Sequence, residues 1–306
     1  MFESDRRSHL ALLVAARGLE DVELVGSGLE FVVYRALDPV RGPVAVRIAR
    51  QRHFKNANDP HVASRALLEQ EFSLTRTLSE RGFPVARAHE LVLGDFDLLT
   101  SELVEPDGSG FSPGEAGRRL ATLHALAPPP DLPVANGGLV AEDQVRQRLI
   151  RRWGELQRRV SDLTEPPPED MLRQALACAS PRSRPSLLHL DVRAANLARR
   201  HGRVVAFLDW SNAMVGPPLL ELARAAEFAR LPENELDAAA LRRGTRRSPR
   251  CPTTPPRSSS TGLTRRSCLR SSSRPRHLIR GARRRMSGAC GCCASTCIRS
   301  NARPPA

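Results

Sequence analysis

Lysine is almost absent from this sequence: Lys55 is the one lysine among 47 basic residues, and the others are arginine. Because arginine codons are rich in G and C and lysine codons are not, this bias indicates a GC-rich coding sequence. Cysteine is scarce as well, since Cys178 stands alone within residues 1–240. This excludes a disulfide framework and is typical of a cytoplasmic protein. No apolar run approaches the roughly 18–20 residues of a membrane helix, so we expect no membrane association.

Acidic residues are missing from the end of the chain. Residues 241–306, called the basic tail below, contain 17 arginines and no Asp or Glu. Residues 1–240 contain 30 basic and 33 acidic residues, so the net charge of +14 combines −3 with +17. The basic tail also lacks Val, Phe, Tyr and Trp. A segment of this composition cannot bury a core and is predicted to be disordered.

The basic tail has three interpretations. We favour a shifted reading frame, because GC-rich DNA read out of frame yields this mixture of Arg, Ser, Pro, Cys and Gly. A genuine basic tail would bind nucleic acid without regard to base sequence, but we expect no nucleic-acid partner. The third interpretation is a zinc site, although no second Cys or His pair stands at the usual spacing. Its cysteines would be Cys290, Cys292, Cys293 and Cys297.

The first third of the chain is predicted to form an antiparallel sheet with one helix. Short apolar runs separated by turn residues predict strands, which fall around 24–25, 31–34, 44–48, 90–93 and 96–104. A helix is predicted over 62–81, where leucines recur at helical spacing and Gly82 follows.

From about residue 112 the pattern becomes mainly helical. Ser112 and Glu115 are spaced as a capping box at the start of a helix. Further helices are predicted around 141–161, 169–179 and 219–229, and short strands around 187–190 and 204–208. A sheet followed by helices predicts an α+β fold with two lobes: an N-lobe over 1–103 and a mainly helical C-lobe over 104–240.

The stretch from His189 to Asn196 carries the strongest chemical signal. Asp191 stands in a loop, Asn196 follows five residues later, and Asp209 follows eighteen residues after Asp191. Phosphoryl transfer from a nucleotide needs a carboxylate that takes the proton of the acceptor hydroxyl, and oxygen ligands that hold Mg²⁺ against the phosphates. The alternative is an ordinary turn followed by a buried strand. The joint spacing of the three residues favours the chemical interpretation.

This His-x-Asp-x-x-x-x-Asn pattern resembles the catalytic loop of the eukaryotic-like kinase superfamily. The continuation from Asp209 through Gly216 to Glu221 resembles its aminoglycoside phosphotransferase/choline kinase branch. The resemblance covers about residues 20–230 and implies a two-lobed protein-kinase-like fold. Members of this branch continue with further helices, so the resemblance also implies that the C-lobe is incomplete after residue 240.

The resemblance implies a role for each matched residue. Asp191 corresponds to the catalytic base, and Asn196 and Asp209 correspond to the ligands of Mg²⁺. Arg193 would contact the γ-phosphate. His189 would shape the loop by hydrogen bonding without acting as an acid or base.

The N-lobe offers matching features for a nucleotide. Gly26, Ser27 and Gly28 resemble a short nucleotide-binding loop, although the same tripeptide suits a plain hairpin turn. Arg47 stands where the related motif has a Lys that grips the α- and β-phosphates, and an arginine binds phosphate as a planar fork. Glu71 lies in a stripe of leucines, where a lone carboxylate is unfavourable. We therefore predict an ion pair between Glu71 and Arg47; the alternative is a Glu that reaches water.

Two further positions follow from the resemblance. Glu102 and Leu103 lie in the strand that resembles the hinge between the lobes, whose backbone contacts adenine. Glu221 is expected to stabilise the catalytic loop from the helix that follows it.

These features predict a Mg²⁺-dependent enzyme that moves the γ-phosphoryl group of ATP or GTP to a hydroxyl of a small molecule. Residues 141–180 carry seven acidic and seven basic side chains, which indicates no charge preference for the acceptor. A protein kinase is an alternative, against which the missing Ala-Pro-Glu motif argues. A non-catalytic nucleotide-binding protein is another. No pattern indicates an oligomeric state.

Overall fold

In the computed structural model, the described residues run from Leu10 to Arg246, except 12, 13, 16, 55–58, 60, 111 and 180–183. The basic tail from residue 247 on lies outside the described residues. For residues 241–246 the predicted disorder is wrong, because they form the end of a helix. Beyond Arg246 the predicted disorder, the nucleic-acid interpretation and the zinc interpretation all fall outside the described part of the chain.

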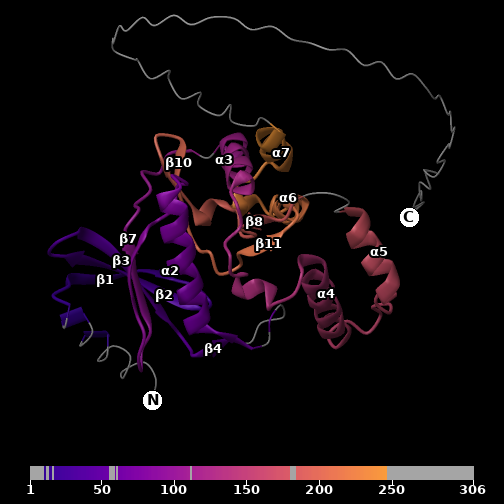
Figure 1. The fold of residues 1–306 in the computed structure, drawn as a ribbon, viewed down its shortest axis with the longest axis horizontal. Helices are drawn as coiled ribbons and strands as arrows, with labels where there is room; N and C mark the ends of the chain where they lie inside the picture. Colours follow the sequence, from indigo (N-terminus) through magenta and orange to yellow (C-terminus); the bar gives the residue numbers. More distant parts are fainter. Residues whose placement is uncertain are drawn as a thin grey trace, which may run out of the picture. The chain divides into compact units, whose positions relative to one another are not determined.

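The N-lobe is an antiparallel sheet with one long helix (Figure 1). The five-stranded sheet has the order β1-β2-β3-β7-β6. Its strands are β1 (Glu20–Ser27), β2 (Phe31–Asp38), β3 (Gly42–Ala49), β6 (Ala88–Val92) and β7 (Leu98–Glu102). The helix is α2 (Ser64–Glu80), and the short pair β4 (His53–Phe54) and β5 (Val62–Ala63) precedes it. All five predicted strands are present, and the predicted helix is shorter by two residues at its start and one at its end.

The β2–β3 hairpin fixes the position of Arg47. The carboxylate of Asp38 accepts the backbone N–H groups of Val40 and Arg41, both at 2.8 Å, and Gly42 closes the turn with a φ of 78°. Such a positive φ suits glycine because it has no Cβ. The resulting register places Arg47 opposite Val33 of β2.

Helix α2 belongs to the cores of both lobes. Its buried Leu67 and Leu68 pack with Leu99 of the sheet, whereas Leu74 and Leu78 join the large core cluster of the C-lobe. The loop from His189 to Asn196 is called the catalytic loop below, after the motif that it resembles. The shared helix explains how residues of the sheet and of this loop are held at fixed positions.

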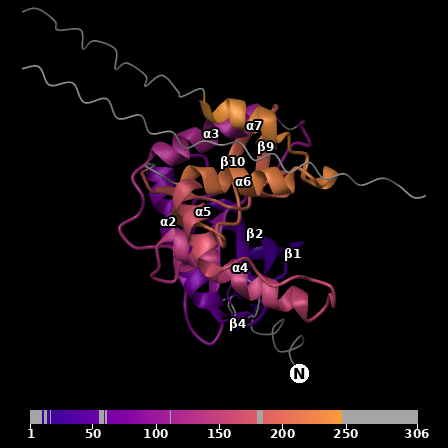
Figure 2. The same ribbon diagram turned by 90° about the vertical axis from the view of Figure 1, so that its right-hand side faces the viewer.

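The C-lobe is mainly helical (Figures 1 and 2). Its helices are α3 (Pro113–Ala125), α4 (Ala141–Gln157), α5 (Glu169–Ala179), α6 (Pro218–Phe228) and α7 (Ala238–Arg246). Single 3₁₀ turns are η1 (Val134–Asn136), η2 (Ala194–Asn196) and η3 (Pro232–Asn234). Two antiparallel pairs complete it: β8 (Ser186–Leu188) with β11 (Met214–Gly216), and β9 (Leu197–Arg200) with β10 (Arg203–Phe207). No helix of the described residues is long and apolar enough to cross a membrane.

The predicted capping box at the start of α3 forms in part, and its Glu115 contacts a strand instead of the cap. The side chain of Ser112 accepts the N–H of Glu115 at 3.4 Å. The carboxylate of Glu115 does not return to Ser112 but accepts the N–H of Val204 in β10 at 2.8 Å. The cap thereby joins α3 to the strand that leads to Asp209.

Helix α7 continues to Arg246, six residues beyond the boundary that we predicted at 240. Its Leu241 is buried in the C-lobe core, and its Gly244 lies against the backbone of α3 at Gly114 and Gly117. Helical structure therefore continues past the point at which acidic residues end. The helical signal was missed because arginines and a glycine dominate the last turns of α7.

Candidate active site

A buried carboxylate holds the catalytic loop. The backbone N–H groups of His189 and Leu190 donate to the two oxygens of Glu221, at 2.7 and 2.8 Å. Glu221 comes from the first turn of α6 and is 1% exposed. Burial opposes its charge, but His124, His189 and the donated N–H outweigh burial and lower the pKa of Glu221. The predicted support of the loop by Glu221 is confirmed.

Two side chains orient Asp191, which is 7% exposed. Asn196 Nδ2 donates to Asp191 Oδ2 over 2.6 Å and to its backbone carbonyl over 3.0 Å. Arg193 Nε lies 3.2 Å from Asp191 Oδ1. Leu190, directly before it, has a φ of 59°, a conformation that is unfavourable for a residue with a Cβ and that clusters at functional sites. The loop thus presents a fixed, ionisable carboxylate.

The ring of His189 has a structural partner on each nitrogen. Its Nδ1 accepts the N–H of Asp191 at 3.2 Å, so the proton lies on Nε2, which donates to the carbonyl of Leu208 at 3.0 Å. The ring also packs edge-on against Trp210, with 4.6 Å between centroids. With both nitrogens occupied, His189 shapes the loop, as predicted.

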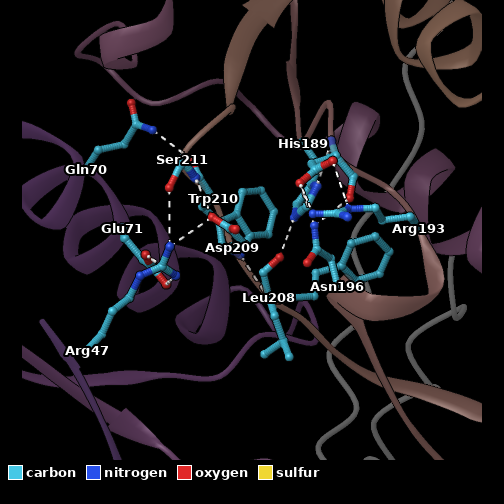
Figure 3. A network of polar contacts seen from close by, with 12 residues as sticks. Arg47, Gln70, Glu71, His189, Arg193, Asn196, Leu208, Asp209, Trp210 and Ser211 are labelled. Atoms are coloured by element: carbon cyan, nitrogen blue, oxygen red, sulfur yellow. Dashed lines mark hydrogen bonds and ion pairs between the residues drawn. The ribbon is translucent and has the colours of Figure 1, made fainter. Parts of the chain in front are cut away.

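Asp209 follows β10 and faces the N-lobe. Its Oδ1 accepts from Arg47 Nη2 at 3.0 Å and from the N–H of Ser211 at 3.4 Å (Figure 3). Burial opposes its ionisation, but the charge of Arg47 and hydrogen bonds from Arg47 and Ser211 lower the pKa of Asp209 to about 2. Asp209 is therefore an ionised carboxylate at neutral pH.

The predicted ion pair between Arg47 and Glu71 is confirmed, with 2.9 Å between Nη1 and Oε2 and side chains only 14% and 13% exposed. Burial and the nearby Asp209 raise the pKa of Glu71, although Arg47 acts in the opposite direction. The guanidinium also lies over the ring of Phe31, 4.3 Å from its centroid. The second contact of Arg47, with Asp209, was not predicted, because nothing in the sequence connects residues 162 positions apart.

Gly26, Ser27 and Gly28 form the β1–β2 hairpin. Ser27 is the last residue of β1, and the N–H of Gly28 donates to the carbonyl of Phe31 at 2.9 Å. The hydroxyl of Ser27 accepts from Arg50. The tripeptide has the hairpin geometry that was the alternative in the sequence, and its contact with phosphate stays a prediction.

Glu102 is the last residue of β7, and Leu103 follows it. The N–H of Glu102 donates to the carbonyl of Arg87 at 2.9 Å, and its carboxylate accepts the N–H of Arg87 at 3.2 Å. A nucleotide base would have to replace Arg87 in order to use this N–H. The contacts of Glu102 and Leu103 with adenine stay predictions.

Two residues near the site carry no signal in the sequence. Glu30 lies in the β1–β2 turn, where burial and the negative charge of Asp209 raise its pKa while Arg47 lowers it. Gln70 is buried on α2, and its Nε2 donates to the carbonyl of Trp210 at 2.8 Å. In a sequence, a Glu in a turn and a Gln in a helix are expected on the surface. Their position near Asp209 becomes visible only in the folded structure.

The residues present suit Mg²⁺. Asp209 supplies an ionised carboxylate, and Asn196 uses its amide nitrogen on Asp191, which leaves its amide oxygen for a ligand. Mg²⁺ prefers such hard oxygen ligands and usually completes its shell with phosphates and water. The described residues hold no group of three or more His, Cys, Asp or Glu that could bind a metal alone.

A pocket of about 400 Å³ lies beside the catalytic loop. Leu190 lines it next to Asp191, and Asn212 and Met214 line it beyond Asp209. The remaining walls come from α4 and α6. The pocket is within the size range of small-molecule sites.

Comparison with known proteins agrees with this geometry. The sequence matches the phosphotransferase enzyme family over residues 21–255. No curated protein sequence matches this chain. The gentamicin complex of APH(2″)-IIa is 14% identical with a TM-score of 0.54, covering 78% of this chain and 80% of that one; this likeness establishes the kinase-like fold.

Other solved structures lie at similar distance. The macrolide 2′-phosphotransferase MphH of Brachybacterium faecium is 20% identical, covers 78% of this chain and 81% of that chain, and has a TM-score of 0.47. The spectinomycin phosphotransferase APH(9)-Ia is 12% identical, covers 78% and 79%, and has a TM-score of 0.48. Since the family match runs from β1 through α7 and includes every residue of the site described above, the chain belongs to the phosphotransferase enzyme family.

Proposed function

We propose that this protein transfers the γ-phosphoryl group of ATP, or GTP, to a hydroxyl group of a small molecule. The observation that carries the proposal is the placement of Asp191: a carboxylate oriented by Asn196 and Arg193, next to a small-molecule pocket. The cluster of Arg47, Glu71 and Asp209 supports a nucleotide site on the N-lobe side of the loop.

In the proposed reaction, Asp191 accepts the proton of the acceptor hydroxyl as its oxygen forms a bond to the γ-phosphorus. The bond from the γ-phosphorus to the bridging oxygen breaks, and the diphosphate nucleotide leaves with that electron pair. Arg193 supplies positive charge beside Asp191, and Arg47 binds the α- and β-phosphates in exchange for Asp209. Asn196 and Asp209 would hold Mg²⁺, which would neutralise charge on the phosphates when bound.

The test is nucleotide consumption by the full chain over a panel of aminoglycosides, macrolides, amino alcohols and sugars. Asp191→Asn should lower kcat by about a hundredfold to ten-thousandfold, the usual contribution of a positioned base. Its affinity for ATP should stay within about threefold of wild type, because Asp191 is not needed to hold the nucleotide. The exposed Asp95→Asn serves as a matched control with unchanged kcat.

The same measurements separate the non-catalytic alternative. If wild type and Asp191→Asn bind ATP with equal affinity, and neither consumes ATP in the presence of any acceptor of the panel, the protein binds nucleotides without catalysis. Turnover that survives Asp191→Asn would overturn the assigned role of this carboxylate.

A further inference from the structure

The pocket beside Asp191 combines an apolar lining with clustered positive charge. Its apolar side chains come from the catalytic loop, from Met214 and from helices α4 and α6, namely Val145, Leu149, Leu190, Leu220 and Ala223. Three arginines line the same pocket: Arg148 and Arg152 from α4, and Arg224 from α6. The equal numbers of acidic and basic residues in 141–180 hid this bias, because the fold directs these arginines to one side.

Of the three arginines, Arg148 forms an ion pair, whereas Arg152 and Arg224 form none among the described residues. Arg148 Nη2 lies 2.6 Å from Asp59 Oδ2. Glu227 is the one acidic residue of the lining, and its carboxylate pairs with Arg230 at 3.1 Å. Among the described residues, no carboxylate lies within ion-pair distance of Arg152 or Arg224.

The positive charges of these arginines repel one another. Burial and the neighbouring Arg224 and Arg148 lower the pKa of Arg152, while Asp59 and Glu155 act in the opposite direction. Burial also lowers the pKa of Arg224, with Arg148 and Arg193 acting in the same direction and Asp191 against it. Like charges at close range destabilise a fold unless an opposite charge joins them. An anion bound in the pocket would supply that opposite charge.

We propose, on the basis of the proposed function, that the acceptor is an anion: a hydroxyl compound with an apolar body and a carboxylate or phosphate group that binds Arg152 and Arg224. Guanidinium groups bind both oxyanions through paired hydrogen bonds. The hydroxyl then loses its proton to Asp191 and gains the phosphoryl group, while the diphosphate nucleotide leaves. A polycationic acceptor would meet repulsion in the same pocket.

The test uses four probes that share one hydrocarbon chain: hydroxyhexanoate, hydroxyhexyl phosphate, hexanediol and aminohexanol. Binding to the full chain is measured by calorimetry with saturating ADP and Mg²⁺, which keeps the anions away from the nucleotide site. One or both anionic probes should bind at least about tenfold more tightly than hexanediol, as expected for one charge-assisted hydrogen bond or more. Comparing the two anions distinguishes a carboxylate from a phosphate site.

The variants are Arg152→Gln, Arg224→Gln and their combination. Arg158→Gln is the control, since Arg158 directly follows the last residue of α4 and its side chain is 73% exposed. The combination should lose about tenfold or more in anion affinity. Its thermal stability should equal or exceed that of wild type, because repulsion is removed. Anion affinity that is unchanged in the combination, or equally lost in Arg158→Gln, would overturn the proposal.

Turnover separates this inference from the proposed function. Phosphorylation of hexanediol or aminohexanol in preference to both anions would overturn the anionic acceptor and leave the phosphotransferase intact. Binding of the anions through Arg152 and Arg224, without turnover of any acceptor, would support the pocket and count against the proposed reaction.

Discussion

Arg47 and Asp209 meet across the two lobes, with 3.0 Å between Nη2 and Oδ1. Glu71 binds the same guanidinium, so one cation serves two carboxylates. The ion pair explains how Glu71 can carry its charge within the leucine stripe. Arg47, the side chain that the resemblance assigns to phosphate binding, is thereby already paired with two carboxylates. In the proposed reaction, the α- and β-phosphates would take the place of Asp209 as a partner of Arg47.

Replacing Glu71 with Gln should lower the free energy of unfolding by about 2 kcal/mol. Breaking a buried ion pair usually costs about 3–5 kcal/mol, and the remaining contact of Arg47 with Asp209 reduces the loss. Urea denaturation of the full chain measures the effect. The exposed Glu69→Gln on the same helix should change stability by less than about 0.5 kcal/mol. Equal losses in both variants would contradict the importance of the pair.

Replacing Glu221 with Gln should reduce both stability and kcat. An amide oxygen can accept one of the two N–H groups of His189 and Leu190, and the amide nitrogen then opposes the other. An unsatisfied buried N–H costs about 1–3 kcal/mol. Because the loop loses its support, kcat should fall while the affinity for ATP stays close to wild type. A wild-type kcat at reduced stability would show that the loop keeps its geometry without this carboxylate.

The contribution of Glu221 should depend on pH. Its pKa in the folded chain lies below the ordinary value of 4.5. Such a carboxylate contributes its full stability above the unfolded value and loses it as the pH falls through the folded value. The difference in melting temperature between wild type and Glu221→Gln should therefore be largest near neutral pH and shrink below about pH 4.5. A difference that grows in acid would reverse the assigned direction.

Two glycine-to-alanine substitutions should act in opposite directions. A Cβ on Gly117 of α3 would overlap the backbone carbonyl of Leu241 in α7, so Gly117→Ala should destabilise the protein by about 1–3 kcal/mol. Gly154 in α4 has open space around the same position, so Gly154→Ala should stabilise it by about 1 kcal/mol. Urea midpoints of the two variants, measured side by side, test the packing of α7 on α3.

The loop from His189 to Asn196 could be located in the sequence by its residue pattern and its resemblance to a known motif. The hydrogen bond between Asp191 and Asn196 is local, but it was not predicted, because the resemblance assigned Asn196 to Mg²⁺. The pair of Arg47 and Glu71 was also predictable, because a charged residue in an apolar stripe needs a partner. The contact of Arg47 with Asp209 was not, since it depends on how α2 joins the two cores.

The charge of the pocket between α4 and α6 could not be predicted from the sequence either. A count of charges along residues 141–180 averages over all faces of α4 and α5. The fold selects Arg148 and Arg152 from α4 and adds Arg224 from a helix more than seventy residues later. The charge inside this pocket therefore depends on which faces of the helices point into it, and composition carries no information about that.

The crossing of α3 and α7 also determines where this chain can be shortened. A cut at residue 240, where acidic residues end, would remove Leu241 from the core and uncover the backbone of α3 around Gly117. Leu241 belongs to the same core cluster as Leu120 and Leu123 of α3, and newly exposed apolar surface favours self-association. A soluble, shortened form should therefore keep α7 complete and end after Arg246.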